Sequence, residues 1–598
     1  KLPNIRLGVS LSAGLLNLDL DVEGMDQAQL FDILSRYDRR KKYFRLKDGS
    51  FLDVSDGQLR ELSALKNGLQ ISDRELKKGK TQVPAYRAMY LDSQLKGGDL
   101  IKVEKDNAFR ALIRNMQTME EHKFQMPREQ EKILRGYQKE GFYWIKTLKH
   151  NQFGGILADD MGLGKTLQVI TFLWSEFQES APGENRRALV ITPASLVFNW
   201  MNEIERFAPG LPATVVTGDV KERKALIKNA GEREVLITSY DLLKRDLKAY
   251  QNLDFAVQII DEAQYIKNHG TQVAKAVKEI RSEFRLALTG TPVENRLSEL
   301  WSIFDFLMPG FLYSYEKFRK EIELPAVQYS NSDAMERLQK IIRPFVLRRL
   351  KRDVLKDLPD KLEKDMFSPL ESEQKELYEA HTERLRLMLG MQSDAEFRTS
   401  KLQILAEITR LRQICCYPGL VYEGYKGNSS KLEMCMELVQ NAVNGGHKIL
   451  LFSQFTTMLD VLAVRLKKAK VSFYMLTGST SKEKRAQMVH AFNEDDTSVF
   501  CISLKAGGTG LNLTAADIVI HYDPWWNLAV QNQATDRAHR IGQQNVVSVY
   551  RLFMKDTIEE RIRALQERKR ELADEILSGE GIGQALISRE EVLELLGR

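Results

Sequence analysis

Cysteine is scarce in this chain, and no long apolar run occurs. Only four cysteines stand among 598 residues: Cys415, Cys416, Cys435 and Cys501. They show no C-x-x-C spacing, which argues for a reducing compartment and against a structural zinc site. No run is long enough to predict a bilayer-spanning helix, and no signal peptide is recognisable. We expect a cytoplasmic protein without a membrane partner.

A strong excess of either charge is also missing. The 88 basic residues nearly balance the 82 acidic ones, and the net charge is +6. This balance permits nucleic-acid binding in a local groove without indicating it. Because 598 residues exceed what one hydrophobic core can organise, we expect three or four domains.

Two parts of the chain alternate short apolar runs with helix-like segments. Continuous apolar strands separated by helices predict parallel sheets covered on both faces. The first set of predicted strands spans 155–158, 188–192, 213–217, 235–238, 256–260 and 285–288. The second set spans 449–453, 472–476, 499–503, 518–522 and 547–552. The pattern predicts an α/β protein with two similar lobes.

The segment between the two sheets, 370–414, has a strongly helical pattern. An apolar stripe at close to helical spacing predicts a packed helical insertion. Its members are Leu402, Leu405, Ile408 and Leu411. The adjacent Cys415 and Cys416 are expected to be small core residues on or just after a helix.

The first 125 residues show a different rhythm and no catalytic grouping. Runs at 43–46 and 51–54 flank an Asp-Gly pair, which is typical of a hairpin. Helical patterns occur at 26–37 and 109–122. The predicted organisation is a small α+β accessory domain at 1–125, a first lobe at 126–362, a second lobe at 363–575 and a tail at 576–598.

The most informative run is Asp-Asp-Met-Gly-Leu-Gly-Lys-Thr at 159–166, between a predicted strand and a predicted helix at 167–177. Small residues let backbone N–H groups face phosphate oxygens, and the helix that follows presents the positive end of its dipole. Lys165 would neutralise phosphates, and the Thr166 hydroxyl would hold Mg²⁺. Asp159 stands where the strict phosphate-loop pattern requires glycine, so the run alone is not decisive.

The run Asp-Glu-Ala-Gln at 261–264 follows the predicted strand 256–260. A carboxylate at the C-terminal end of a buried strand can reach a metal held at a phosphate loop, which suits Asp261. Glu262 is then placed to polarise the attacking water. Acidic residues also favour the start of a helix, so the run standing alone would indicate only a helix cap.

Two further runs are polar turns that contain glycine. Leu-Thr-Gly-Thr-Pro at 288–292 ends a predicted strand and would sense the γ-phosphate, although by itself it indicates only a capped turn. In the second lobe, 503–512 contains Gly-Gly-Thr-Gly-Leu-Asn. Its glycines permit close approach of the backbone to a phosphate-bearing partner.

Arg537 and Arg540 belong to the run Asp-Arg-Ala-His-Arg-Ile-Gly-Gln at 536–543. Three residues apart, they are predicted to lie on one side of a helix and to point at one target. Guanidinium groups aimed at a developing phosphate charge are what an arginine finger requires. The alternative is a surface salt-bridge cluster that uses Asp536.

Taken in order, these runs resemble the SWI/SNF-type branch of the superfamily-two helicase-like ATPases. The set opens with Gln138 in Leu-Arg-Gly-Tyr-Gln. Further matches are Asn-Trp at 199–200, Leu-Trp at 300–301, Phe-Leu at 306–307, Arg-Arg-Leu-Lys at 348–351 and Ser-Gln-Phe at 453–455. The family's phosphate loop also carries an acidic residue where Asp159 stands. Two departures are Gln264, where many relatives have histidine, and Leu528, where many have proline.

The resemblance implies two RecA-like lobes that bind one ATP with Mg²⁺ between them. Gln138 would read the adenine and Glu262 would be the base. The residues assigned to the nucleotide are Gln138, Asp160, Gly162, Gly164, Lys165, Thr166, Gly510, Arg537 and Arg540. The catalytic set is Lys165, Asp261, Glu262, Arg537 and Arg540, and the metal set is Thr166 and Asp261.

The resemblance also implies double-stranded DNA as the partner. The residues assigned to its backbone are Thr192, Pro193, Asn199, Ser453, Gln454, Thr509 and Trp526. Family members move along duplex DNA without separating its strands and displace or remodel bound proteins. Because the first 125 residues resemble the domain that precedes the ATPase in some bacterial members, we expect a compact, monomeric, nucleoid-associated bacterial protein.

Two rival functions share the same motifs. A strand-separating DNA or RNA helicase uses the same phosphate and arginine chemistry, but the run at 536–543 and the helical insertion disfavour it. An ATP-gated DNA-binding scaffold with low turnover would have the same lobes. The intact Lys165, Asp261 and Glu262, together with both arginines, disfavour that alternative.

Overall fold

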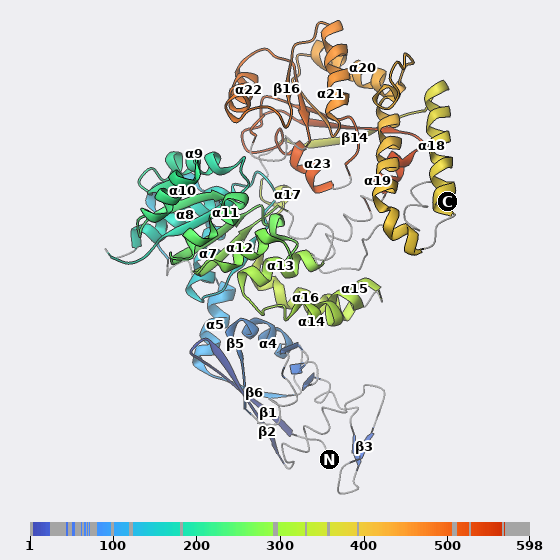
Figure 1. The fold of residues 1–598 in the computed structure, drawn as a ribbon. Helices are drawn as coiled ribbons and strands as arrows, with labels where there is room; N and C mark the ends of the chain where they lie inside the picture. The colour runs from blue at the N-terminus through green and yellow to red at the C-terminus, as the bar shows by residue number, and fades with distance from the viewer. Residues whose placement is uncertain are drawn as a thin grey trace.

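The computed structural model of the chain shows two large sheets covered by helices and a smaller sheet at the N-terminal end (Figure 1). The structure describes residues 4–23, 43–45, 51–53, 61–62, 65–66, 68–69, 71, 80–96, 101–118, 124–179, 183–290, 297–328, 332–355, 359–390, 394–504, 511–525, 528–564 and 567. Both large sheets are parallel throughout, so the fold is α/β with two lobes, as the alternating pattern predicted.

A four-stranded sheet in the order β5-β2-β1-β6 lies at the N-terminal end. Its strands are β1 (Asn4–Ser12), β2 (Leu15–Glu23), β5 (Lys80–Pro84) and β6 (Lys102–Lys105). Its helices are α4 (Ala88–Leu95) and α5 (Asn107–Thr118). The predicted hairpin is confirmed by β3 (Tyr43–Arg45) and β4 (Phe51–Asp53), and the helix predicted at 109–122 by α5. The helix predicted at 26–37 lies outside the described residues.

A buried arginine joins this region to the first lobe. Arg87 Nη2 donates to the Phe311 carbonyl oxygen at 2.7 Å, and its guanidinium lies 4.6 Å from the centre of the Tyr313 ring. The Tyr313 hydroxyl in turn donates to the Gly68 carbonyl at 3.0 Å. The apolar residues of the two regions form one continuous core, so the N-terminal sheet is packed on the first lobe.

The first lobe is a seven-stranded parallel sheet in the order β13-β7-β12-β11-β8-β10-β9. Its strands are β7 (Gly155–Leu157), β8 (Ala188–Thr192), β9 (Ala213–Val215), β10 (Val235–Ser239), β11 (Phe255–Asp261), β12 (Ser282–Leu288) and β13 (Val346–Leu347). All six predicted strands are confirmed. The seventh, β13, has only two residues and therefore carries no periodic signal.

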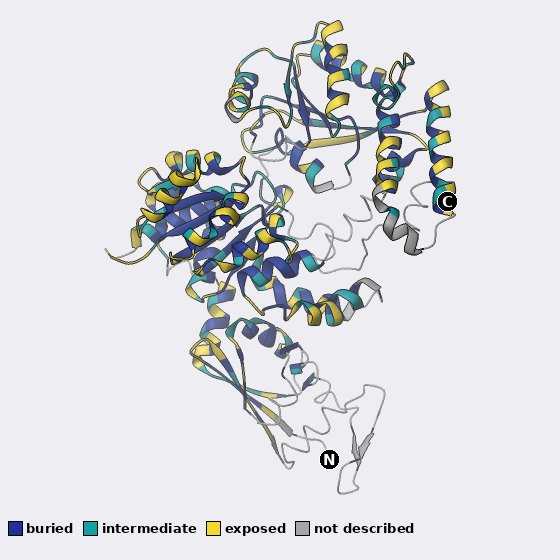
Figure 2. Ribbon diagram, viewed as in Figure 1, coloured by how far each residue is buried: buried dark blue, intermediate teal, exposed yellow. Residues whose placement is uncertain are grey.

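Helices cover both faces of this sheet, with their exposed sides turned outward (Figure 2). They are α6 (Arg128–Ile133), α7 (Gly136–His150), α8 (Lys165–Glu179), α9 (Val197–Phe207), α10 (Val220–Lys228), α11 (Tyr240–Tyr250), α12 (Gln272–Glu279) and α13 (Leu297–Leu307). Four more helices follow in the described part of this lobe: α14 (Tyr315–Phe318), α15 (Leu324–Gln328), α16 (Ser332–Ile342) and α17 (Lys351–Val354).

The second lobe is a six-stranded parallel sheet in the order β14-β19-β18-β15-β17-β16. Its strands are β14 (Lys361–Ser368), β15 (Ile449–Ser453), β16 (Phe473–Leu476), β17 (Val499–Ser503), β18 (Ile518–His521) and β19 (Val547–Met554). Its helices are α20 (Ser430–Asn444), α21 (Thr456–Lys468), α22 (Lys482–Glu494) and α23 (Leu528–Thr535). The five predicted strands are confirmed, whereas the charged edge strand β14 was not predicted. The boundaries at 125, 362 and 575 stay predictions.

The helical insertion consists of two long helices, α18 (Ser372–Gly390) and α19 (Asp394–Cys416), which stand beside the second lobe (Figure 1). Its helical character is confirmed, but one member of the predicted stripe is wrong. Leu405 is 45% exposed, whereas Ile408 and Leu411 are buried as predicted, and Ile404 is buried in place of Leu405. The side chain of Leu402 lies outside what the structure describes. The buried face of α19 is rotated relative to the predicted one, because α19 packs against both α18 and the segment after β19.

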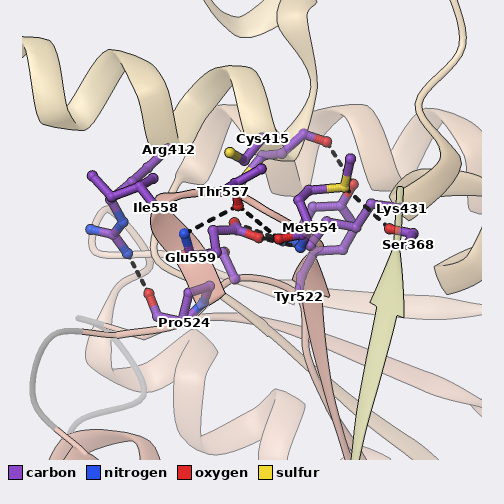
Figure 3. A network of polar contacts seen from close by, with 12 residues as sticks. Ser368, Arg412, Cys415, Lys431, Tyr522, Pro524, Met554, Thr557, Ile558 and Glu559 are labelled. Atoms are coloured by element: carbon purple, nitrogen blue, oxygen red, sulfur yellow. Dashed lines mark hydrogen bonds and ion pairs between the residues drawn. The ribbon is translucent and has the colours of Figure 1, made fainter. Parts of the chain in front are cut away.

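A fully buried ion pair anchors the insertion side of the second lobe (Figure 3). Lys431 Nζ, on α20, contacts both carboxylate oxygens of Glu559 at 2.8 and 2.7 Å. Glu559 also accepts a hydrogen bond from the Met554 N–H at 2.9 Å. The Tyr522 hydroxyl donates to the Cys416 carbonyl at the end of α19, also at 2.9 Å. These contacts bind α19, α20 and the sheet into one body.

All four cysteines are buried and free, and Cys415 and Cys416 end helix α19, as predicted. Within the described ranges, we find no helix with the length and apolarity needed to cross a membrane.

Candidate functional site

The run 159–164 forms a tight loop between β7 and α8 at the C-terminal edge of the first sheet. Gly162 and Gly164 have φ angles of 82° and 74°, in the left-handed region that favours glycine. A Cβ atom on Gly164 would lie 2.5 Å from Gln138 Nε2, so a larger residue would displace that side chain. Helix α8 begins directly after the loop, which makes its N-terminus available to an anion.

Asp159, the residue that breaks the strict phosphate-loop pattern, is completely buried. Its carboxylate accepts from Arg349 Nε at 2.9 Å and from Arg349 Nη2 at 2.5 Å. Gln168 Nε2 donates to the same carboxylate at 3.2 Å. Arg349 also donates to the Tyr137 carbonyl, so one guanidinium joins the loop to α7. Asp159 therefore anchors the loop.

Lys165 and Gln138 both face the loop. Lys165 Nζ donates to the carbonyl oxygens of Asp159 and Asp160 at 2.6 and 3.3 Å. Gln138 Nε2 donates to the Leu163 carbonyl at 3.0 Å, while its Oε1 accepts from the Arg135 N–H that caps α7. Thr166 follows as the second residue of α8. The structure thus gathers Gln138 with the residues of the loop.

Asp261 ends β11 opposite the loop. Its Oδ2 accepts from Trp200 Nε1 at 2.9 Å and from the Thr192 hydroxyl at 3.2 Å. Burial raises the pKa of Asp261, although these donors and Lys165 oppose the rise. The Glu262 N–H also donates to Asp261 Oδ1 at 2.9 Å, so three donors fix the orientation of the carboxylate. Trp200 is a supporting residue whose only signal in the sequence was the Asn-Trp pair.

Glu262 has a strained backbone, with φ of 53° and ψ of 60°. A non-glycine residue rarely adopts this left-handed conformation, and such strain concentrates at functional sites. Its side chain caps no helix, which removes the alternative of a simple helix cap. Burial and the neighbouring Asp261 raise the pKa of Glu262 to about 7. Glu262 is therefore a carboxyl group suited to accept a proton near neutral pH.

A short chain of hydrogen bonds runs from Glu262 to the run at 288–292. Gln264 Nε2 donates to Glu262 at 2.7 Å, and the Thr289 hydroxyl donates to Gln264 Oε1 at 3.1 Å. Gln264, a departure from many relatives, thus joins the acidic run to the polar turn. Thr291 and Pro292 lie outside the described residues.

Arg537 and Arg540 reach this site from the second lobe, but not from a helix as the spacing predicted. Helix α23 ends at Thr535, and both arginines lie in the turns that follow. The carbonyl oxygen of Arg537 accepts from the Leu513 N–H, and that of His539 accepts from Lys351 Nζ. These oxygens therefore bond to distant donors and not to N–H groups of a continuing helix.

The two arginines face different parts of the first lobe. The Cβ of Arg540 is 3.1 Å from the position that a Cβ on Gly162 would occupy, so Arg540 lies directly over the phosphate loop. Arg537 is buried and electrostatically attracted to Glu262. Its Nε and Nη2 have no hydrogen-bond partner. Burial lowers the pKa of Arg537 to about 10.

Two of the residues predicted to contact DNA, Thr192 and Ser453, end strands β8 and β15, and Pro193 and Gln454 follow them directly. Thr192 and Ser453 are buried and direct their hydroxyls to carboxylates, Thr192 to Asp261 and Ser453 to Asp523 at 2.5 Å. Gln454 is half-buried; its N–H also contacts Asp523, and its side-chain Nε2 has no hydrogen-bond partner. In both lobes, these contacts tie the strand end to a buried carboxylate.

Pro193 follows Thr192 and is buried. Asn199, on α9, donates to Glu203 Oε1 at 3.1 Å. Burial raises the pKa of Glu203, and Arg540 opposes this rise. Asn199 thus contacts a carboxyl group that is itself attracted to Arg540. Three predicted residues, Thr509, Gly510 and Trp526, lie outside the described residues.

ATP and Mg²⁺ fit the residues that the structure brings together. The unpartnered nitrogens of Arg537 lack the acceptors that an anion would supply, and the glycine loop places Lys165 at the start of a helix, where backbone N–H groups favour anions. The part of the chain that the structure describes contains no group of three or more histidine, cysteine, aspartate or glutamate residues placed to hold a metal. A cation here would need phosphate oxygens as further ligands, which is how Mg²⁺ usually binds.

Family models match nearly the whole chain. The model of the SNF2-related domain matches residues 137–420, that of the helicase conserved C-terminal domain matches 430–542, and that named bacterial SNF2 helicase associated matches 1–127. The chain belongs to the SNF2 family.

Several SNF2-family relatives align with most of the chain. A Mycoplasma pneumoniae protein named "Uncharacterized ATP-dependent helicase" is 40% identical over 487 residues, covering 81% of this chain and 46% of that protein. The Bacillus subtilis "Putative ATP-dependent helicase/translocase YwqA" is 40% identical over 501 residues, covering 80% and 53%. The chain spans about half the length of these curated relatives. The solved "Sulfolobus solfataricus SWI2/SNF2 ATPase core in complex with dsDNA" is 38% identical, covering 75% of this chain and 93% of that one, with a TM-score of 0.38.

Proposed function

We propose that this chain is a DNA-stimulated ATPase that moves along double-stranded DNA without separating its strands, and that displaces or remodels bound proteins. Arg537 carries the proposal: its buried guanidinium comes from the second lobe, faces Glu262 of the first, and has two unpaired nitrogens. An unpaired buried cation is costly, and phosphate oxygens would supply the missing acceptors. The relatives' names, which include ATP-dependent helicase and translocase, support the same activity.

Each residue of the site has a position that suits one task. Lys165 would exchange the loop carbonyls for phosphate oxygens. Glu262, whose pKa burial raises, would orient a water and accept its proton. Arg537 and Arg540 would offset the charge that develops on the transferred phosphoryl group. Thr166 and Asp261 would hold Mg²⁺, which supplies neutralisation of the phosphates when bound.

Duplex DNA is the proposed partner, contacted through its backbone. Gln454 supports this assignment, because the buried Asp523 holds its backbone N–H while its side-chain Nε2 is buried without a hydrogen-bond partner, so a phosphate oxygen would satisfy this donor if the side chain turned outward. Backbone contacts carry no sequence information, so we expect binding that is independent of sequence and that weakens steeply with salt. Thr509 and Trp526 stay predictions, as does association with the nucleoid.

The first experiment measures ATP hydrolysis by the full chain with blunt duplex DNA, single-stranded DNA or RNA. We expect stimulation by the blunt duplex and no hydrolysis by the Lys165→Ala variant under any condition. Equal rates with all three nucleic acids, or a rate that Lys165→Ala does not change, would refute the proposal.

A second experiment separates translocation from unwinding. Displacement of a third strand from a triplex reports movement along an intact duplex, and a tailed duplex reports strand separation. We expect ATP-dependent triplex displacement and no unwinding. Unwinding without stimulation by blunt duplex would favour the strand-separating helicase, and binding with no turnover would favour the ATP-gated scaffold.

A further inference from the structure

Lys351 contacts the phosphate loop through its backbone. It follows the run Arg348-Arg349-Leu350 and begins helix α17. Its N–H donates to Asp160 Oδ2 at 3.0 Å, while the preceding Arg349 holds Asp159. Two nearly consecutive residues of this segment therefore bind the two consecutive aspartates at the head of the loop.

The side chain of Lys351 contacts the second lobe. Its Nζ donates to Asp536 Oδ1 at 2.5 Å and to the His539 carbonyl oxygen at 2.7 Å. These two acceptors lie on either side of Arg537 in the sequence. Lys351 is only 8% exposed, so this ion pair is largely shielded from solvent. One residue thus touches both halves of the candidate site.

The surroundings of Lys351 strengthen this link. A Cβ on Gly162 would lie 3.5 Å from Lys351 Cε, which places the side chain against the phosphate loop along its path. His539 Nε2 donates to the Pro359 carbonyl at 2.9 Å, so the loop that bears the arginines is also held by the segment that leads to β14. Burial lowers the pKa of Lys351 and Asp536 opposes this effect, so the partner favours the charged amine.

We infer that Lys351 is a positioning residue that couples the phosphate loop to the loop bearing Arg537 and Arg540, and that holds the two lobes together before a nucleotide binds. When Asp160 moves with the phosphate loop, the hydrogen bond to the Lys351 N–H would move Lys351 with it. The ion pair between the Lys351 ammonium and Asp536 would then shift the loop that bears the arginines. The effect on turnover rests on the proposed function, whereas the effect on lobe closure does not.

Lobe closure is measured first, on the nucleotide-free full chain. Because all four native cysteines are buried, spin labels can be attached to introduced cysteines at two exposed positions, Lys224→Cys on α10 and Lys467→Cys on α21. Pulsed electron resonance then gives the distribution of distances between the lobes. We expect one narrow distribution in the parent chain and a broad one, shifted to longer distances, in Lys351→Met. An unchanged distribution in Lys351→Met would overturn the inference.

The matched control is Arg352→Met. Arg352 is the next residue on α17 and its side chain is 80% exposed, so its loss removes a neighbouring positive charge without touching the second lobe. We expect the distance distribution of the parent chain. Broadening in this variant equal to that of Lys351→Met would assign the effect to general charge loss and overturn the inference.

Steady-state kinetics test positioning against a purely structural ion pair. We expect Lys351→Met to lower kcat by about 10²-fold, as misplaced catalytic groups do, with KM for ATP nearly unchanged. The double variant Lys351→Met/Asp536→Leu removes both buried charges, so its melting temperature should return toward that of the parent. If kcat returns with it, Lys351 is merely structural; if kcat stays low, Lys351 positions the arginines.

These measurements distinguish a failure of the proposed function from a failure of the positioning role of Lys351. If the parent chain hydrolyses no ATP under any condition, the proposed function is wrong, and the distance distributions alone decide the role of Lys351. If the parent chain hydrolyses ATP and Lys351→Met matches it in both kcat and lobe distances, the role of Lys351 is wrong and the proposed function stands.

Discussion

Arg349 holds Asp159 with two guanidinium nitrogens across 190 positions of sequence, at 2.9 and 2.5 Å. The aspartate that replaces the expected glycine is therefore the attachment point between the phosphate loop and the segment that leads to the second lobe. Asp160 makes the corresponding contact with the Lys351 N–H. The head of the loop is an acidic pair, and each carboxylate has its own partner in the run 349–351.

Restoring glycine at position 159 should therefore harm the protein. Asp159→Gly leaves the Arg349 guanidinium buried without its carboxylate, and breaking a buried pair costs about 3–5 kcal/mol. We expect this loss in the free energy of unfolding, measured by urea denaturation. The double variant Asp159→Gly/Arg349→Leu should recover part of it. A stability equal to that of the parent in Asp159→Gly would contradict the anchoring role.

Glu262→Gln should abolish hydrolysis while ATP still binds. The amide keeps the size of the side chain but cannot accept a proton, and general-base catalysis contributes roughly 10²–10⁴-fold. DNA-stimulated phosphate release and the affinity for a fluorescent ATP analogue are the two measurements. The exposed Glu283→Gln, on the neighbouring strand β12, is the control and should behave as the parent. Turnover that survives in Glu262→Gln would remove the base assignment.

Arg537→Ala should cost activity but not stability. Its guanidinium is buried with two unpaired nitrogens, so its removal should leave the melting temperature unchanged or higher. Loss of an arginine finger lowers turnover by about 10³–10⁵-fold. Arg540→Ala should likewise lower kcat with nucleotide binding nearly intact. A defect confined to binding in either variant would argue against the finger role.

His521 should make the second lobe sensitive to acid. Burial and the nearby Arg551 lower the pKa of His521 to about 3, from an ordinary value of about 6.5. Below pH 6.5 the His521 imidazole is protonated in the unfolded chain but stays neutral in the folded chain. The free energy of unfolding therefore falls as the pH falls from neutrality toward 3. Between pH 7.5 and 5.5 this one residue should cost about 1.4 kcal/mol.

The comparison for His521 is the variant His521→Gln, which keeps a polar side chain next to the Thr535 hydroxyl, 2.8 Å from His521 Nε2. Urea denaturation at both pH values gives the measurement. We expect the variant to lose less stability on acidification than the parent. Equal losses in the two proteins would show that His521 is not the acid-sensitive group.

Local patterns predicted the sheets well because buried parallel strands have a strong signal. Strands β8 and β15, for instance, are buried at all five positions, and the first four residues of each are an uninterrupted apolar run. Strand β14 carries no such run, because Lys361, Glu363 and Lys364 are exposed on its outer half. It becomes a strand by pairing with β19, which follows nearly two hundred residues later.

In the candidate site too, some features were evident from the local sequence and others depended on long-range contacts. The glycines of the loop and the carboxylates that end β11 were evident from residue type and spacing. The helix expected at 536–543 is wrong, because the Arg537 and His539 carbonyls bond to Leu513 and Lys351. The run Arg-Arg-Leu-Lys at 348–351 was noticed only through its resemblance to the family, and its residue types did not indicate which groups Lys351 contacts.

The sequence by itself determined which chemical groups are present and which local shapes they prefer: a glycine loop before a helix, carboxylates at a strand end, and two arginines in a second lobe. The tertiary structure alone decided which of these groups meet. Arg349 and Asp159 are 190 residues apart, and Lys351 and Asp536 are 185 apart. The energy of such a pair depends on its distance and on its removal from water, and both are set by the packing of the two lobes.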